Sequence, residues 1–250
     1  MSETIRLFHL SDVHFGLEDR RAIAWVKATI ASERPAAVAI TGDLTMRARH
    51  RECDAAVEWI NSLDAPVTVE VGNHDMPYFN LVERFFHPYR RIRGIESQVE
   101  REIDLPGLAI VSLKTAVRAQ PRFNWSKGWV SRSALAKCLD AIDALPKGTQ
   151  VLVAAHHPLV EVGTRGTALT RNGNKALREL ARRSVLGVLT GHVHDPFDVR
   201  HVVEEREIRL IGAGTLSERV RDSAPSFNEL RLGVGIETIA RHMGAPDLPL

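Results

Sequence analysis

Residues 5–14 read IRLFHLSDVH, an apolar run that ends in an Asp-x-His triplet. A short apolar run bounded by polar residues is typical of a buried β-strand. Four more runs of this kind follow along the chain: AAVAITGD (36–43), PVTVEVGNHD (66–75), VLVAAHHP (151–158) and VLGVLTGHVH (185–194). Each apolar run leads into Asp, Asn or His, side chains that can bind metal ions, so these stretches decide both fold and chemistry.

Segments with helical patterning separate these runs. We predict helices over 19–32, 51–63, 81–86, 131–145 and 175–183, with Ser131 as an N-cap. We predict the strands themselves over 5–12, 36–43, 66–71, 151–155 and 185–189, and two more over 99–104 and 108–115. Strands that alternate with helices indicate parallel βα units, so the fold class is α/β.

The chain after residue 196 has a different pattern. Four closely spaced strand candidates, over 197–203, 207–211, 227–232 and 236–241, have no helical stretch between them. This spacing predicts a second, more antiparallel sheet. The arginine-rich stretch 90–93 is interpreted as solvated surface.

Length and composition bound the class of protein. With 250 residues, 44% of them hydrophobic and 26% charged, the chain suits a single globular domain over residues 1–250. The net charge of +2 argues against a nucleic acid partner. No apolar run approaches the roughly 18 residues that span a bilayer, the N-terminus has no secretion pattern, and two distant cysteines fit a reducing compartment. We therefore expect a cytoplasmic protein without membrane contact.

The polar residues at the strand ends form a mixed set of donors. Because the carboxyl ends of parallel strands meet at one edge of a sheet, residues distant in sequence converge there. Oxygen and nitrogen donors together favour Mn, Fe, Zn or Co over Ca or Mg. Seven ligands are too many for one tetrahedral ion and predict two divalent metal ions. The candidate ligands are Asp12, His14, Asp43, Asn73, His156, His192 and His194.

Each of these motifs is weak when it stands alone. Gly42-Asp43 could be a turn after a strand, and paired histidines at a strand end could make structural hydrogen bonds. The order D-x-H, G-D, G-N-H-D, H-H and G-H-x-H, each after an apolar run, is too specific for chance.

This ordered set resembles the calcineurin-like metallophosphoesterase superfamily over about residues 5–195. The tail from Gly214-Thr215-Leu216 to Ser226-Phe227-Asn228 is similar to the closing strands of its bacterial branch of cyclic-nucleotide and glycerophosphodiester phosphodiesterases. The resemblance implies a four-layer α/β/β/α sandwich with two mixed sheets and a site at the C-terminal ends of the strands.

The same resemblance implies two metal positions that share Asp43 as a bridging ligand. One would be held by Asp12, His14, Asp43 and His194, and the other by Asp43, Asn73, His156 and His192. The reaction would be hydrolysis of a phosphodiester, of cyclic nucleotide or glycerophosphodiester type, by a hydroxide that bridges the two metals.

Further residues have roles implied by this resemblance. His74 would be catalytic, facing the phosphate from outside the metal shell, and could protonate the leaving group. Asp75 would be catalytic through His74, whose ring it would orient. Asn73 would bind substrate together with His74, and His157 would have a supporting or substrate-facing role.

Several alternatives stay open at this point. A phosphomonoesterase or a nuclease would use the same metal core, and a non-catalytic scaffold on this fold would bind a partner protein. The expected partner is a small phosphodiester substrate, and the branch also allows a homodimer. Specificity would come from the polar loops 117–128 and 163–174. Their candidate side chains, each of which could equally lie free on the surface, are Arg118, Arg122, Asn124, Trp125, Arg165 and Arg171.

Overall fold

The structure, a computed structural model, describes residues 4–99, 103–220 and 223–250. The strands are β1 (Ile5–Leu10), β2 (Ala37–Ile40), β3 (Val67–Val69), β4 (Leu108–Ser112), β5 (Gln150–Ala154), β6 (Gly187–Thr190), β7 (Phe197–Val203), β8 (Arg206–Gly212), β9 (Ser226–Leu232), β10 (Ile236–His242) and β11 (Leu248–Pro249). The helices are α1 (Arg20–Glu33), α2 (His50–Asn61), α3 (Leu81–Phe86), α4 (Arg90–Val99), α5 (Arg132–Asp143) and α6 (Gly173–Arg182). Within the described residues the strands form two sheets, in the orders β11-β10-β9-β1-β2-β3 and β4-β5-β6-β8-β7.

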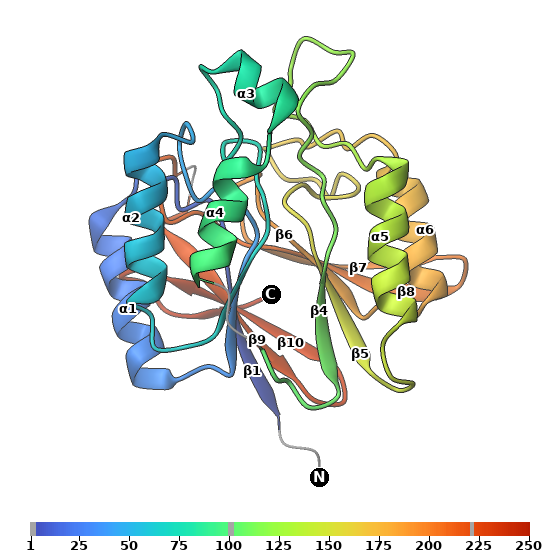
Figure 1. Cartoon of the computed structure of the whole chain (residues 1–250). Helices are drawn as coiled ribbons and strands as arrows, with labels where there is room; N and C mark the ends of the chain where they lie inside the picture. The colour runs from blue at the N-terminus through green and yellow to red at the C-terminus, as the bar shows by residue number, and fades with distance from the viewer. Residues whose placement is uncertain (1–3, 100–102, 221–222) are drawn as a thin grey trace.

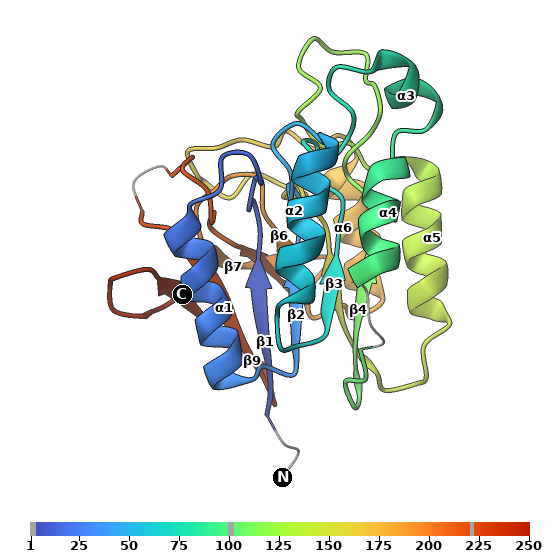
Figure 2. The ribbon, with the colours of Figure 1, turned by 60° about the vertical axis from the view of Figure 1, so that its left-hand side comes forward.

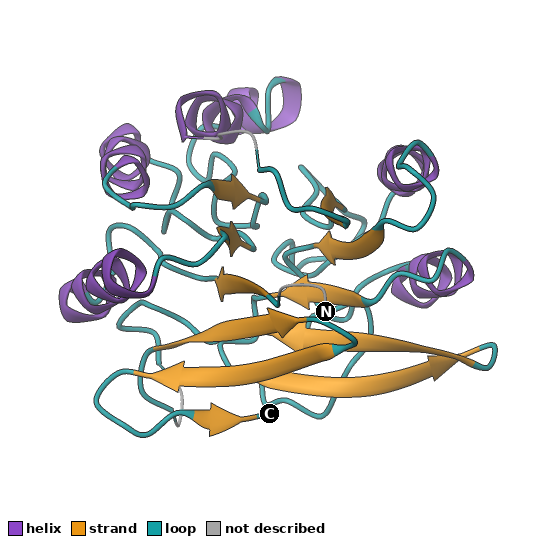
Figure 3. Cartoon of the chain, turned by 90° about the horizontal axis from the view of Figure 1, so that it is seen from below, coloured by secondary structure: helices purple, strands orange, loops and turns teal. Residues whose placement is uncertain are grey.

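Side chains that point alternately to the two faces of each strand build the layers of the fold. In β1, Phe8 joins a core shared with α1, α2 and α4, whereas its neighbour Leu7 joins a core between the two sheets. In β5, Val153 joins a core shared with α5 and α6, whereas Leu152 joins the core between the sheets. Because successive side chains of a strand point to opposite faces, each sheet has helices outside and the other sheet inside. This confirms the predicted four-layer α/β/β/α sandwich (Figure 1, Figure 3).

Side-chain caps set where two of the helices begin. The carboxylate of Asp19 accepts hydrogen bonds from the backbone nitrogens of Arg21 and Ala22 at the start of α1. The hydroxyl of Ser131 accepts one from the backbone nitrogen of Ala134 at the start of α5. Such caps satisfy amide groups that the first turn leaves unpaired. None of the helices in the described ranges is long and apolar enough to span a bilayer.

The four C-terminal strands do not form a separate sheet, which corrects the prediction. β7 and β8 extend the sheet that contains β6, with β8 parallel to β6. β9 and β10 extend the sheet that contains β1, with β9 antiparallel to β1. Strand patterning reports which faces are buried but not which open edge a hairpin joins, and here each hairpin joins a different sheet. Both sheets are therefore mixed.

The predicted strand over 99–104 is wrong where it can be compared. Val99 is the last residue of α4, and Ile103 and Asp104 belong to no strand. Residues 100–102 lie outside the described residues.

The segment 90–93, expected to be solvated surface, is the first turn of α4. Ile92, Ile95 and Val99 lie on one helical face and are almost fully buried. Their spacing of three and four residues is that of an amphipathic helix. Frequent arginines and a central Gly94 mask this apolar stripe in the sequence.

The strands that carry candidate ligands end at one edge of the molecule. β1, β2 and β3 run parallel in one sheet, and β5 and β6 run parallel in the other. Their C-terminal ends point to the top of Figure 1, where α3 and the loop after β4 stand above the sheets. Figure 2 shows the same two segments beside each other from another side. Loops from both sheets therefore meet beneath α3.

A candidate metal centre between the two sheets

The first candidate cluster lies where the loops after β1 and β6 meet. His194 Nε2 is 3.0 Å from Asp12 Oδ1, and His14 Nε2 is 3.5 Å from the same oxygen. The two histidine Nε2 atoms are 3.3 Å apart, although the residues are 180 positions apart in the chain. All three side chains are buried. Nitrogen and oxygen lone pairs thus converge on one point.

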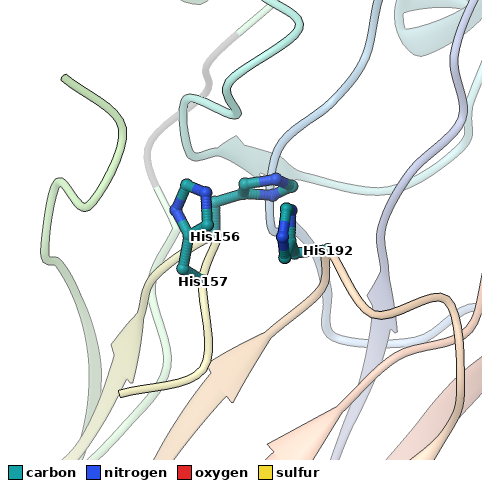
Figure 4. Close-up of side chains that lie close together, drawn as sticks. All are labelled: His156, His157 and His192. Carbon is teal, nitrogen blue, oxygen red and sulfur yellow. The ribbon is translucent and has the colours of Figure 1, made fainter. Parts of the chain in front are cut away.

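Asp43 connects this cluster to a second one. Its Oδ2 is 3.9 Å from His14 Nε2 and 3.3 Å from His156 Nε2. His156 Nε2 is also 3.2 Å from Asn73 Oδ1. The ring of His192 lies 5.3 Å from that of His156, measured between centroids, and Figure 4 shows these rings close together at the ends of β5 and β6. The structure therefore brings all seven candidate ligands together.

The arrangement of the lone pairs fits bound cations. Asp12 Oδ1 is buried, and the groups nearest to it are the Nε2 atoms of His194 and His14, at 3.0 Å and 3.5 Å. Two nitrogens bound to one tetrahedral zinc at about 2.0–2.1 Å would lie roughly 3.3 Å apart, which matches the distance between His14 and His194. Trios of side chains with ligand atoms within 4.8 Å of one another are Asp12-His14-His194, His14-Asp43-His74, Asp12-Asp43-His156 and His156-His157-His192. These groups could hold metal ions.

The pKa values of the cluster also indicate that it favours positive charge. Burial would raise the pKa of Asp43, but His156 and His74 hold this pKa below its ordinary value. Burial would lower the pKa of His156, but Asp43 raises it to about 10. Burial and the neighbouring His156 lower the pKa of His192 to about 3. The buried carboxylate therefore stays ionised and favours cations around it.

Backbone carbonyl groups hold three of the histidine rings. His74 Nδ1 donates a hydrogen bond to Met46 O over 2.7 Å. His156 Nδ1 donates to Thr41 O over 2.7 Å, and His194 Nδ1 donates to Arg219 O over 2.9 Å. Each bond fixes the tautomer that leaves Nε2 free to face the cluster, as in metal-binding histidines. The sequence could not identify these partners, because a backbone carbonyl has no side-chain signature.

The ligand-bearing loops have a rare backbone conformation. The torsion φ is positive, between 52° and 69°, at Asp12, His14, Asp43, His192 and His194. This left-handed region is unfavourable for residues other than glycine, and such strain gathers at functional sites. Five ligand positions therefore hold a conformation that the surrounding structure must impose.

Two glycines of the motifs allow the loops to approach one another. A Cβ atom at Gly72 would lie 2.1 Å from Asp43 Oδ1, and one at Gly191 would lie 1.7 Å from Ser11 Oγ. Asp43 is itself a candidate ligand, and Ser11 Oγ donates a hydrogen bond to the candidate ligand Asp12. The glycines of the G-N-H-D and G-H-x-H motifs are thus required by close packing.

Comparison with known proteins identifies the family. The sequence profile described as calcineurin-like phosphoesterase matches residues 5–196, well over half of the chain. The chain belongs to this family.

Two curated relatives of this phosphoesterase bear the names of phosphodiesterases. A glycerophosphodiester phosphodiesterase from Enterobacter lignolyticus is 26% identical over 206 residues, which cover 76% of this chain and 70% of the relative. A probable cyclic nucleotide phosphodiesterase from Rhodopseudomonas palustris is 27% identical over 200 residues, which cover 75% of this chain and 70% of the relative.

Solved structures of similar proteins share the fold. A dimetal phosphatase from Danio rerio has a TM-score of 0.68 and 17% identity, over 98% of both chains. A purple acid phosphatase from yellow lupin has a TM-score of 0.68 and 12% identity, over all of this chain and 54% of its own. At these identities the structures establish the fold alone.

In this phosphoesterase Asp75 does not orient the ring of His74, which corrects the expectation. Asp75 Oδ1 accepts hydrogen bonds from Thr45 N (2.8 Å) and Thr45 Oγ1 (3.0 Å). Its Oδ2 accepts one from Gly72 N (2.9 Å). The carboxylate therefore joins the loops after β2 and β3, and it acts on the backbone that carries His74 rather than on the imidazole.

His157 is fully buried and has a partner at each ring nitrogen. Nε2 donates to the carbonyl of Ser126 over 2.9 Å, so Nδ1 accepts from Thr115 Oγ1 over 2.9 Å. Burial and the neighbouring His192 lower its pKa well below the ordinary value. A neutral ring engaged at both nitrogens fits the supporting alternative rather than the substrate-facing one.

A cleft of about 310 Å³ opens over the cluster. Besides Asp43 and His74, it is lined by three cationic side chains: Lys127, Arg165 and Arg219. Arg219 Nη1 is 3.2 Å from His74 Nε2. Sequence analysis missed Lys127 and Arg219, and the position of Arg219 shortly after β8, at the same edge of the sheet, is the one signal that could have identified it.

The other side chains proposed from the two polar loops divide into two groups. Arg165 lines the cleft over the cluster, and Asn124 and Trp125 line a neighbouring cleft. The rest bind the protein itself: Arg118 donates to Phe85 O, Arg122 donates to Leu169 O and Gly128 O, and Arg171 stacks over Trp129 at 4.9 Å.

Proposed function

We propose that this chain is a phosphodiesterase that hydrolyses small phosphodiesters with two divalent metal ions, drawn from Mn, Fe, Zn or Co. The observation that carries the proposal is the convergence of carboxylate, amide and imidazole donors, most of them buried, around Asp43. Two relatives named as phosphodiesterases support the diester as substrate.

The donors divide into two sets that share Asp43. One ion would be held by Asp12, His14, Asp43 and His194, and the other by Asp43, Asn73, His156 and His192. When bound, such ions supply Lewis-acid charge and a nucleophile at neutral pH. The protein's contribution is to present these donors already in place, because the carbonyls and left-handed turns fix them before any ion binds.

The remaining residues of the cleft act on the substrate. Lys127, Arg165 and Arg219 surround the cluster with positive charge, which attracts and orients an anionic phosphate. His74 faces the same cleft through Nε2, because its Nδ1 hydrogen is given to Met46 O. A proton on Nε2 can be donated to the leaving oxygen, a step typically worth about 10²–10⁴ in rate.

The deciding experiment compares bis(p-nitrophenyl) phosphate with p-nitrophenyl phosphate on metal-stripped protein before and after Mn²⁺ is added. We expect turnover that requires the metal and favours the diester. A preference for the monoester would assign the chain to the phosphomonoesterases. Two bound metals with no turnover of either substrate, or of natural diesters, would favour the non-catalytic scaffold.

A further inference from the structure

A second cleft continues from the one over the metal centre. It has a volume of about 560 Å³ and shares Asn73, His74 and Ser126 with the first cleft. Its size is within the range of small-molecule sites. A group esterified to a phosphate beside His74 would therefore extend into this second cleft.

The far wall of this second cleft is apolar and exposed. It is formed by Tyr78 and Leu81 near α3 and by Phe123 and Trp125 in the loop after β4, and we call it the aromatic cleft. Tyr78 is 64% exposed and Phe123 is fully exposed. None of the four belongs to a hydrophobic core of the described residues. Apolar side chains gathered at the surface of a cleft mark a binding site rather than a folding core.

Arg84 supports the aromatic wall and also lines the cleft, although it is only 5% exposed. Its Nε donates to Arg118 O over 2.9 Å and its Nη1 to Pro77 O over 3.3 Å. The guanidinium lies 5.3 Å from the ring of Trp125, and Phe85 contacts the same ring edge-on at 6.1 Å. These contacts order the indole before any ligand arrives, which reduces the entropy lost on binding.

We propose that the aromatic cleft binds the organic group esterified to the phosphate and that it takes a planar heterocycle, such as a nucleobase, in preference to a polyol such as glycerol. This inference rests on the proposed function. A planar ring can stack on Trp125 or Tyr78 and bury apolar surface there. Glycerol has no planar apolar face to stack on these rings, so the apolar wall would stay exposed to water even if Asn124 bonded its hydroxyl groups. Asn124 at the rim can bond the polar edge of a base.

The first test compares kcat/KM for cyclic AMP and for glycerophosphoethanolamine on the Mn²⁺-loaded protein. We expect the unmodified chain to favour cyclic AMP. Trp125→Ala should reduce the ratio of the two kcat/KM values by roughly tenfold to hundredfold, mainly through KM, because stacking is lost. Trp125→Phe keeps an aromatic face and should restore most of the ratio. Equal losses for both substrates, or a preference of the unmodified chain for glycerophosphoethanolamine, would overturn the proposal.

Phe86→Ala is the matched control. Phe86 is an aromatic residue of the same region of α3 that is 73% exposed, but it does not line the aromatic cleft. Its removal should leave the ratio unchanged. If Phe86→Ala reduced the ratio as much as Trp125→Ala, recognition would belong to the outer surface of α3 and the proposed subsite would be wrong.

A binding measurement separates this proposal from the proposed function. By calorimetry, adenosine monophosphate should bind the unmodified chain roughly tenfold more tightly than it binds Trp125→Ala. If diester turnover is absent but this difference is found, the subsite stands and the proposed function fails. If diester turnover is present but adenosine monophosphate binds both proteins alike, the subsite alone is overturned.

Discussion

The metal centre and the aromatic cleft lie side by side but are built in opposite ways. In the metal centre, charged and polar side chains are buried, and left-handed turns and carbonyl hydrogen bonds hold them. In the aromatic cleft, the apolar side chains of Tyr78, Leu81 and Phe123 are exposed, at the start of a six-residue helix and in a loop. The candidate metal centre is built from loops of both sheets, whereas the aromatic cleft is built from α3 and the loop after β4, which stand above the sheets. The difference teaches that reaction chemistry and substrate choice can change separately in this molecule.

The largest effect is expected from Asp43→Asn. Asp43 is the carboxylate that faces both His14 and His156, and an amide would remove the negative charge that both metal positions share. Metal content by mass spectrometry should fall, and diester turnover should drop below detection. The control is Asp140→Asn, which changes an exposed carboxylate of α5. Full metal content and full activity in Asp43→Asn would contradict the proposed bridging role.

His74→Ala should separate metal binding from proton transfer. Because His74 faces the cleft but is no proposed ligand, we expect both ions to stay bound while kcat falls by about 10²–10⁴. His50→Ala, which removes an exposed histidine at the start of α2, serves as the control. Retained turnover in His74→Ala would show that its imidazole is not catalytic.

Arg219→Ala should have a smaller effect, on binding. The loss of a charge-assisted hydrogen bond, worth about 1.5–3 kcal/mol, corresponds to roughly a tenfold to hundredfold rise in KM for a diester. The exposed Arg200→Ala, outside both clefts, should leave KM unchanged. A fall in kcat alone would show instead that Arg219 acts in the transition state.

The smallest effect is expected from adding Mn²⁺ to the metal-stripped protein, followed by amide hydrogen exchange. Residues 11–16, 41–46 and 191–196 carry ligands and should exchange more slowly, because bound ions stabilise these loops. Residues 81–86 and 117–126, in the aromatic cleft, should change little. Equal protection of both regions would mean that metal binding also stabilises the aromatic cleft.

The sequence predicted the centre of this molecule better than its surroundings. Asp12, Asp43 and His156 each follow an apolar run, so strand geometry alone places them at one edge. The carbonyl groups of Met46 and Thr41 orient the histidines. They could not be predicted, because every residue type has a backbone carbonyl. The family resemblance gave Asp75 the role of orienting the His74 ring, but in this structure the carboxylate accepts hydrogen bonds from Thr45 instead.

The fold shows a similar division. The stretch 81–86 was predicted as a helix with the bounds that the structure has. The partners of the C-terminal strands could not be predicted, since pairing at an edge depends on tertiary contacts far along the chain. Helix α4 was missed because three arginines and Gly94 lie among its three apolar residues, although Ile92, Ile95 and Val99 have helical spacing.

The division of the last strands between the two sheets also has a consequence in time. All strands of the sheet β4-β5-β6-β8-β7 lie before residue 213, so this sheet can form while the ribosome is still adding residues. β1 pairs with β2 early in the chain, but its other edge stays open until β9, which pairs Leu230 with Leu7, has been made. Asp12 likewise waits for the hydroxyl of Thr215, which holds its carbonyl at 2.7 Å. The candidate ligands of the loop after β1 therefore reach their final arrangement only once the segment around Thr215 has been made.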